Sequence, residues 1–323
     1  MNHLKKSHFL YLLLIVLTFS SCETEEDVNA KKETLYELVS QREDWSSLAN
    51  ALQITGLDET LTSDGEYTLF APSNAAFSAF LAESNLNSIN EVPVDYLRQL
   101  LLNHVILTKI KKEDFPSSGY LQSLATGFAS PSNHLSLYFK KTDNLISING
   151  GSTFDGTNVI ASNGIIYNFN SVLKLPTIVD HIVANPNLES LFNALETNNQ
   201  YGFIEELSSI NNGPYTLFAP IDSAFPSLLT ELNQPSLDVI DPIVVAQVLK
   251  YHVAITSNTL SGTLNHGDVI NTFQGNALTI QLTPANFRLV DYNNRLSNFT
   301  TRDIQCYNGI IHMVDRVLLP NLN

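Results

Sequence analysis

Histidine, cysteine and the carboxylates are the residue types in this sequence that could carry catalysis or bind a metal ion. A zinc site needs ligands at short, fixed spacings, such as two histidines four residues apart on one helix, or a Cys-x-x-Cys pair. Neither spacing occurs, because the six histidines after the N-terminal segment are scattered: His104, His134, His181, His252, His266 and His312. We therefore expect no metal site and no cofactor.

Motifs for nucleophilic catalysis and phosphate binding are also missing from the sequence. No Gly-x-Ser-x-Gly elbow occurs, and Gly150-Gly151-Ser152 fits neither that elbow nor a phosphate-binding loop. Cys306 lies beside apolar residues, where a thiol acts as a small apolar side chain. The sequence therefore predicts a protein that is not an enzyme. A hydrolase would instead need a deep pocket with convergent carboxylates, or a histidine beside a hydroxyl.

His104 and His252 stand at matching places, each just after an apolar run and directly before a valine. Such a histidine is more often a buried residue bonded to the backbone than a ligand or a base. We therefore predict a structural role for both.

The N-terminus has the order of an export signal. Lys5 and Lys6 precede an apolar stretch too short for a membrane span, and small residues then lead to Ser20-Ser21-Cys22. The Cys22 position resembles the lipobox of bacterial lipoproteins, in which the thiol carries the lipid, although Phe19 departs from the usual leucine. We predict a signal peptide at residues 1–21, with an ordinary cleaved signal as the alternative.

An acidic run follows Cys22, and residues 22–32 are predicted to form a solvated tether. The run resembles the export tags of surface lipoproteins of the Bacteroidota, and a plain spacer is the alternative. The formal charge is −15, and it becomes −17 without Lys5 and Lys6. We see no basic patch in either half, so nucleic acid is not an expected partner.

An internal repeat organises the rest of the chain. Tyr-Thr-Leu-Phe-Ala-Pro occurs at residues 67–72 and again at residues 215–220, and the match extends through Ala-Phe to His-Val without a gap. Asn-Gly-Ile-Ile recurs at residues 163–166 and 308–311. Repeats of this length are domains and not solenoid units, so we predict two domains, residues 33–176 and 177–323, joined by a short linker.

In each unit, the spacing of apolar residues changes along the chain. Apolar residues at helical spacing open both units, and alternating runs such as residues 135–139 and 278–282 are typical of half-buried strands. Asn74 and Asp222 follow the Ala-Pro that ends each first strand, and we predict that they cap the next helix. Asn-Gly between apolar runs predicts a primed hairpin turn with positive φ at both residues.

These ordered motifs resemble those of the fasciclin domain, and both units carry them. The resemblance implies an α+β fold, with a wedge or barrel of strands packed against several short helices. The matching positions, which we interpret as structural, are Tyr67, Phe70, Pro72, Asn74, Phe77, His104, Asn163, Gly164, Tyr215, Phe218, Pro220, Asp222, Phe225, Asn308 and Gly309.

The resemblance also suggests contact sites in the second unit. Tyr251-His252 and Asp303-Ile304 are similar to dipeptides that some animal relatives use in adhesion, whereas the first unit has Asn103-His104 and Asn158-Val159. Burial of Tyr251 and Ile304 is the competing interpretation.

The combined expectation is a lipid-anchored outer-membrane protein at the cell surface that binds a protein or polysaccharide ligand. The membrane contact would be made through Cys22. An accessory binding component of an outer-membrane glycan-uptake system is the alternative.

Overall fold

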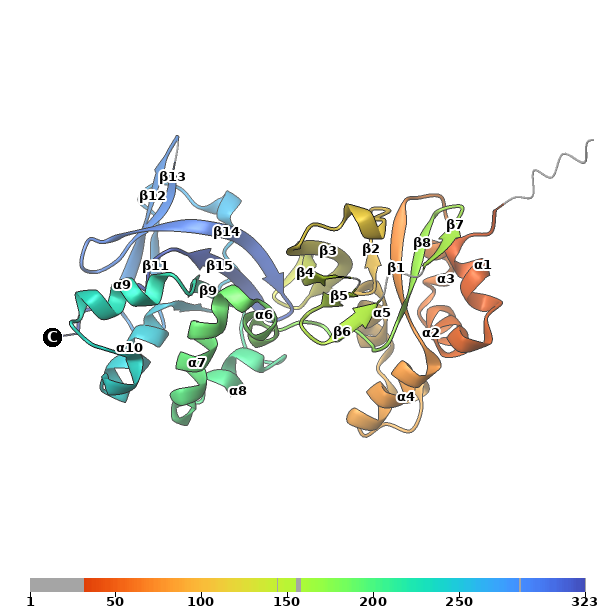
Figure 1. Cartoon of the computed structure of the whole chain (residues 1–323), viewed down its shortest axis with the longest axis horizontal. Helices are drawn as coiled ribbons and strands as arrows, with labels where there is room; N and C mark the ends of the chain where they lie inside the picture. The colour runs from red at the N-terminus through yellow and green to blue at the C-terminus, as the bar shows by residue number, and fades with distance from the viewer. Residues whose placement is uncertain (1–31, 144, 155–157, 285, 323) are drawn as a thin grey trace, which may run out of the picture. The chain divides into compact units, whose positions relative to one another are not determined.

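The computed structural model describes residues 32–143, 145–154, 158–284 and 286–322 (Figure 1). Residues 33–323 form one compact unit. The predicted signal peptide, Cys22 and all but the last residue of the tether lie outside the described residues. Within the part of the chain that is described, no helix is both long and apolar enough to cross a membrane.

The first domain begins with helices and ends with strands. Its helices are α1 (Leu35–Ser40), η1 (Glu43–Trp45), α2 (Ser46–Thr55), α3 (Asp58–Thr62), α4 (Asn74–Glu83), η2 (Ile89–Glu91), α5 (Val94–Leu102) and η3 (Lys112–Asp114). Its strands are β1 (Tyr67–Pro72), β2 (Val105–Ile106), β3 (Ser118–Gly127), β4 (Ser130–Thr142), β5 (Leu145–Ile148), β6 (Ser152–Phe154), β7 (Asn158–Ala161) and β8 (Gly164–Phe169).

The second domain repeats this order. Its helices are α6 (Ile178–Ala184), η4 (Pro186–Leu188), α7 (Glu189–Thr197), η5 (Asn199–Tyr201), α8 (Phe203–Ser208), α9 (Ala224–Glu231), η6 (Leu237–Val239), α10 (Pro242–Tyr251) and η7 (Ser261–Thr263). Its strands are β9 (Tyr215–Pro220), β10 (Val253–Ile255), β11 (Val269–Asn271), β12 (Ala277–Thr283), β13 (Asn286–Val290), β14 (Leu296–Cys306) and β15 (Gly309–Val314).

Each domain contains one mixed sheet. The strand order is β6-β5-β4-β3-β2-β1-β8-β7 in the first domain and β10-β9-β15-β14-β13-β12-β11 in the second. The strand with the repeated hexapeptide, β1 or β9, runs parallel to the last strand of its domain. It runs antiparallel to β2 or β10, the short strand that follows the helix and histidine present in both domains. Helices and sheet in each unit confirm the predicted α+β class.

Burial on both faces explains the apolar hexapeptide. All six residues of β1 are buried. Leu69 packs in the core between the helices and the sheet, whereas Phe70 packs in a second core, together with residues of β4, β5 and β8. A parallel strand covered on both sides has no solvent-facing positions, so it cannot show the polar alternation of a half-buried strand. In β9, Leu217 and Phe218 divide between two cores in the same way.

The Asn-Gly turns are tight, but the predicted positive φ is wrong. Ala161 pairs with Gly164 across a two-residue loop, and neither Asn163 nor Gly164 has a positive φ. Glycine is required for another reason, because a Cβ at Gly164 would lie 2.5 Å from the carbonyl oxygen of Tyr67 on the neighbouring strand. The second turn repeats this arrangement, with Asn308, Gly309 and Tyr215.

Asn74 and Asp222 do not cap the helices that follow them, so this prediction is also wrong. Ser73 caps α4, where its side chain accepts a hydrogen bond from the backbone N–H of Ala76. Asn74 Oδ1 instead accepts from the N–H of Ser47 at 2.9 Å, near the start of α2. In the same way, Asp222 Oδ1 accepts from the N–H of Ser190 at 2.8 Å, near the start of α7. Each residue satisfies an orphan N–H of a different helix.

The two domains are in direct contact within the compact unit. Gln305 N–H donates to Ser136 Oγ at 3.0 Å, and Asn185 Nδ2 donates to the Tyr120 hydroxyl at 3.0 Å. Ala129 N–H donates to the carbonyl of Tyr307 at 3.2 Å. Strands β3 and β4 of the first domain therefore pack against β14 and α6 of the second.

Candidate functional site

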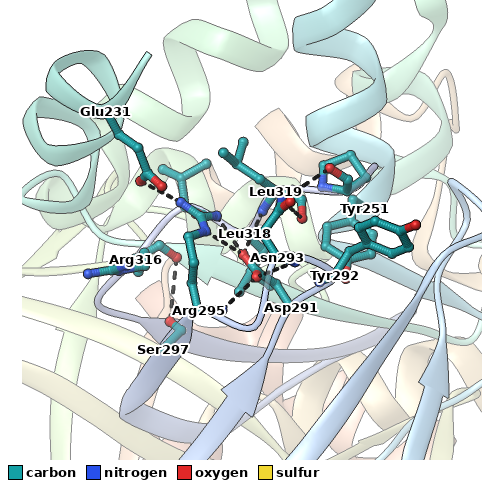
Figure 2. A network of polar contacts seen from close by, with 12 residues as sticks. Glu231, Tyr251, Asp291, Tyr292, Asn293, Arg295, Ser297, Arg316, Leu318 and Leu319 are labelled. Carbon is teal, nitrogen blue, oxygen red and sulfur yellow. Dashed lines mark hydrogen bonds and ion pairs between the residues drawn. The ribbon is translucent and has the colours of Figure 1, made fainter. Parts of the chain in front are cut away.

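Tyr251 and His252, the predicted contact pair, lie inside the second domain. Tyr251 is fully buried, and His252 is 1% exposed. The Tyr251 hydroxyl accepts from the N–H of Tyr292 at 2.9 Å (Figure 2). It also donates to the carbonyl of Ala277 at 2.9 Å. Burial raises the pKa of Tyr251 to about 12. The side chain therefore serves as a hydrogen-bonded core residue and presents no surface to a ligand.

His104 and His252 make the same pair of hydrogen bonds in the two domains. His104 Nδ1 bonds the Leu100 carbonyl at 2.8 Å, and its Nε2 accepts from the N–H of Leu173 at 2.8 Å. His252 bonds the Val248 carbonyl at 2.7 Å and accepts from the N–H of Leu318 at 3.0 Å. This pattern needs a neutral imidazole with the proton on Nδ1. Burial lowers the pKa of each histidine to about 4, which keeps it neutral.

A buried ion-pair network stands next to Tyr251 (Figure 2). The Asp291 carboxylate accepts from Arg295 Nε at 2.8 Å and from the N–H of Leu319 at 3.1 Å. Arg295 also donates to Glu231 at 2.6 Å and to the Val317 carbonyl at 2.8 Å. The network ties the segment after β15 to the β13–β14 turn. The sequence analysis did not predict this network. Its only sign in the sequence is that Asp291 and Arg295, two residues of opposite charge, stand four positions apart.

Asp303 and Ile304, the second predicted contact pair, differ in exposure. Ile304 is 2% exposed, whereas the Asp303 side chain is 37% exposed. Asp303 adopts a φ of +60°, and its carboxylate accepts from the N–H of Ser261 at 2.7 Å and from the Ser261 hydroxyl. A non-glycine residue at positive φ is strained, and the bonds to Ser261 hold it there.

Ser261, Asp303 and His312 are the residue types of a hydrolytic triad, but their connections are not those of one. His312 Nδ1 accepts from the backbone N–H of Asp303 at 3.2 Å, and Nε2 bonds the Thr259 carbonyl at 2.8 Å. The serine hydroxyl bonds the carboxylate and not the imidazole. The hydroxyl therefore lacks the imidazole base that activates the serine of a hydrolytic triad.

The remaining chemistry-bearing groups form no reactive centre within the described residues. There, no group of three or more His, Cys, Asp or Glu side chains could hold a metal ion. Cys306 is fully buried, and burial raises the pKa of its thiol well above the usual value, which disfavours the reactive thiolate.

Five lysines, which we term the lysine cluster, gather at one end of the first domain: Lys109, Lys111, Lys112, Lys140 and Lys141. Lys141 Nζ donates to the carbonyls of Lys112 at 3.0 Å and Phe115 at 3.2 Å. Pairing of Ser118 with Lys140 brings the end of β4 beside η3. Strand pairing therefore joins lysines that are distant in sequence, which the expectation of no basic patch in either half did not take into account.

Comparison with known proteins was made for the whole chain. A family model described as the fasciclin domain matches residues 43–176 and 186–320. Human periostin is 29% identical over 275 residues, which cover 82% of this chain and 30% of periostin. Protein sll1483 of Synechocystis is 33% identical over 143 residues, which cover 44% of this chain and 74% of that protein.

A solved FAS1 domain pair from the insect cell adhesion molecule fasciclin I aligns with a TM-score of 0.47 and 19% identity, over 88% of this chain and 95% of that one. The chain spans only 30–40% of the length of the first animal relatives it matches. Because the family model covers most of the chain in two consecutive stretches, the chain belongs to the fasciclin domain family and carries two such domains in tandem.

Proposed function

We propose that this protein is a non-enzymatic adhesion or ligand-binding protein, held at the outer-membrane surface by a lipid on Cys22. The single observation that carries the proposal is the fasciclin match over both domains, because fasciclin-domain proteins are involved in cell adhesion. The uses of the histidines support it, since His104, His252 and His312 are bonded to the backbone and hold the fold together.

The proposed anchor rests on the order of the N-terminal segments and on the serine pair before Cys22. A tether of about ten residues reaches at most roughly 35 Å when extended, so the domains would stay close to the membrane. More than one acyl chain would hold them firmly, whereas a single chain would not.

Protease shaving of intact producing cells tests the location, with Cys22→Ala as the matched variant. Removal of the wild-type domains by protease, together with release of the variant from the membrane fraction, is the expected result. A wild-type protein that resists shaving but stays with membranes would instead face the periplasm and bind an internal partner. A variant that fractionates like the wild type would contradict the lipid anchor.

Asp303 is the one residue of the two predicted contact pairs that reaches the surface, and we retain it as a proposed ligand contact. Asp303→Asn keeps a residue that tolerates positive φ while removing the charge. Adhesion of cells displaying this variant should fall, whereas Arg316→Gln, an exposed change elsewhere in the domain, should leave adhesion unchanged. If cells displaying Asp303→Asn adhered as well as those displaying Arg316→Gln or the wild type, with unchanged melting temperatures, Asp303 would not be a ligand contact.

A further inference from the structure

The lysine cluster is an unusual feature in a chain of net charge −15. Lys109, Lys111 and Lys140 make no ion pair with a carboxylate of the described residues. Three carboxylates on the same segments, Glu113, Asp114 and Asp143, offset part of the charge. The cluster nevertheless keeps an excess of positive charge on a protein whose total charge is strongly negative.

The second domain shows that the fold does not require these lysines. In the first domain, Thr68 Oγ1 donates to the carbonyl of Thr108 and accepts from the N–H of Ile110. Thr216 makes the same two bonds in the second domain, with Ser257 and Thr259. This shared frame places Asn258 where the first domain has Lys109, and Leu260 where it has Lys111.

The β4–β5 hairpin also has a counterpart in the second domain with a neutral residue in place of a lysine. Thr142 pairs with Leu145 in the first domain, and Thr283 pairs with Asn286 at the corresponding hairpin of the second. Gln281 therefore corresponds to Lys140. The same backbone arrangement forms with neutral side chains at all three positions, so the lysines contribute something other than folding.

We propose that the lysine cluster binds an acidic polysaccharide, with the ammonium groups contacting its carboxylate or sulfate groups. The proposal rests on the proposed ligand-binding function and specifies its ligand. Charge complementarity carries it, because an anionic polymer is repelled by most of this protein and attracted here. Exposed hydroxyls of Ser117, Ser118 and Thr142 border the lysines and can exchange hydrogen bonds with sugar hydroxyls.

The composition of the cluster favours this ligand over other polyanions. It contains no arginine, the residue that reads phosphate and base edges by paired hydrogen bonds, and no exposed aromatic ring on which a base could stack lies between residues 107 and 118. The exposed apolar residues on its segments are Leu107 and Leu145, two single side chains. Stable docking on a lipid surface needs a continuous apolar face as well as basic residues.

Binding of the full chain to polygalacturonic acid and to dextran sulfate tests the proposal, with uncharged dextran as a control. Lys109→Asn/Lys140→Gln installs the residues of the second domain. Lys250→Gln/Arg316→Gln removes the same charge from the second domain. We expect affinity for at least one acidic polymer to fall about tenfold in the first variant only. Raising salt from about 50 mM to about 500 mM should also weaken binding.

Three outcomes would overturn the proposal. The first is no binding of either acidic polymer at about 50 mM salt, where charge attraction is least screened. The second is an equal loss of affinity in both double variants, which would indicate an effect of total charge. The third is binding only to vesicles containing an anionic lipid. If one of these outcomes is found but cells that display the protein still adhere, the proposed function stands and only the assignment of an acidic polysaccharide as the ligand fails.

Discussion

The two domains differ in how the second and third strands of each sheet meet. In the first domain, β2 pairs with β3 through Ile106 and Ser123. In the second domain, the corresponding strands β10 and β11 lie at opposite ends of the strand order and do not pair with each other among the described residues. The same order of elements therefore folds with or without this pairing, so pairing at this edge does not define the domain.

The buried contacts of the turn asparagines, in contrast, are the same in both domains. Asn163 Oδ1 accepts from the first N–H of α1, and its Nδ2 donates to the carbonyls of Leu61 and Ser63. Asn308 repeats all three bonds with α6, Leu207 and Ser209. Because buried backbone groups need partners, these side chains tolerate fewer substitutions than the sheet edges do. The difference separates the positions that hold the fold from those that can diverge for function.

Replacing the turn asparagine should give the largest effect. Asn163→Ala leaves one N–H and two carbonyls without a partner, at about 1–3 kcal/mol each, so we expect a loss of about 4 kcal/mol. Trp45, the single tryptophan, is buried in the first domain and reports its unfolding by fluorescence in urea. Asn308→Ala should have a similar effect on the second domain, measured by circular dichroism.

Asn193→Ala, a change on the exposed face of α7, is the control and should change stability by less than about 0.5 kcal/mol. If Asn163→Ala or Asn308→Ala changed stability as little as this control, the inference that the turn asparagines stabilise both domains would be wrong. A shift of the Trp45 transition by Asn308→Ala would instead show that the domain contact couples their unfolding.

Acid should weaken both domains through their histidines. The folded pKa of His104 and His252 is about 4, below the ordinary 6.5, so the folded state favours the neutral ring. Their contribution is complete above pH 6.5 and is lost as the pH falls towards 4, at about 3 kcal/mol for each histidine. Unfolding free energies measured between pH 7.5 and pH 4.5 check this.

His104→Gln and His252→Gln are the matched variants. Each should be less stable than the wild type at pH 7, because the backbone partners of the ring lose their bonds, but should lose less stability on acidification. An unchanged pH dependence in either variant would show that its histidine does not titrate with folding.

The sequence predicted the features that depend on local pattern, and it failed where tertiary contacts decide. Apolar periodicity located the strands at residues 135–139 and 278–282, although the first is buried on both faces and is not the half-buried strand that was predicted. The repeat predicted two tandem domains of one family, which the family model confirms. The targets of Asn74 and Asp222 depend on where α2 and α7 pack, which no local pattern contains. The need for glycine at position 164 comes from the carbonyl of a strand nearly a hundred residues earlier.

Long-range placement also explains what was missed at the candidate sites. The lysine cluster arises only when β4 pairs with β3, and the network around Asp291 needs a chain segment that follows the last strand. Tyr251 was recognised as a residue of a family motif, but its burial is set by the partners of its hydroxyl, Ala277 and Tyr292.

At His181 the second domain has a buried polar side chain where the first domain has an apolar one. Replacing it should give the smallest effect on stability, and the effect should be a gain and not a loss. His181 lies one residue after the capping box of α6, where the first domain has Leu38 after the capping box of α1. The ring is fully buried against Tyr120, and among the described residues neither nitrogen makes a hydrogen bond of good geometry, although the Ser136 backbone lies near the ring. Unsatisfied buried nitrogens cost free energy that leucine would not.

We therefore expect His181→Leu to stabilise the second domain by about 1 kcal/mol at pH 7. The gain should grow below pH 6.5, because burial lowers the pKa of His181 to about 4 and protonation opposes folding. Urea midpoints from circular dichroism measure it, and His134→Leu, at an exposed histidine, should show no such gain. Destabilisation by His181→Leu would mean that the ring nitrogens have partners after all, such as buried water between the domains.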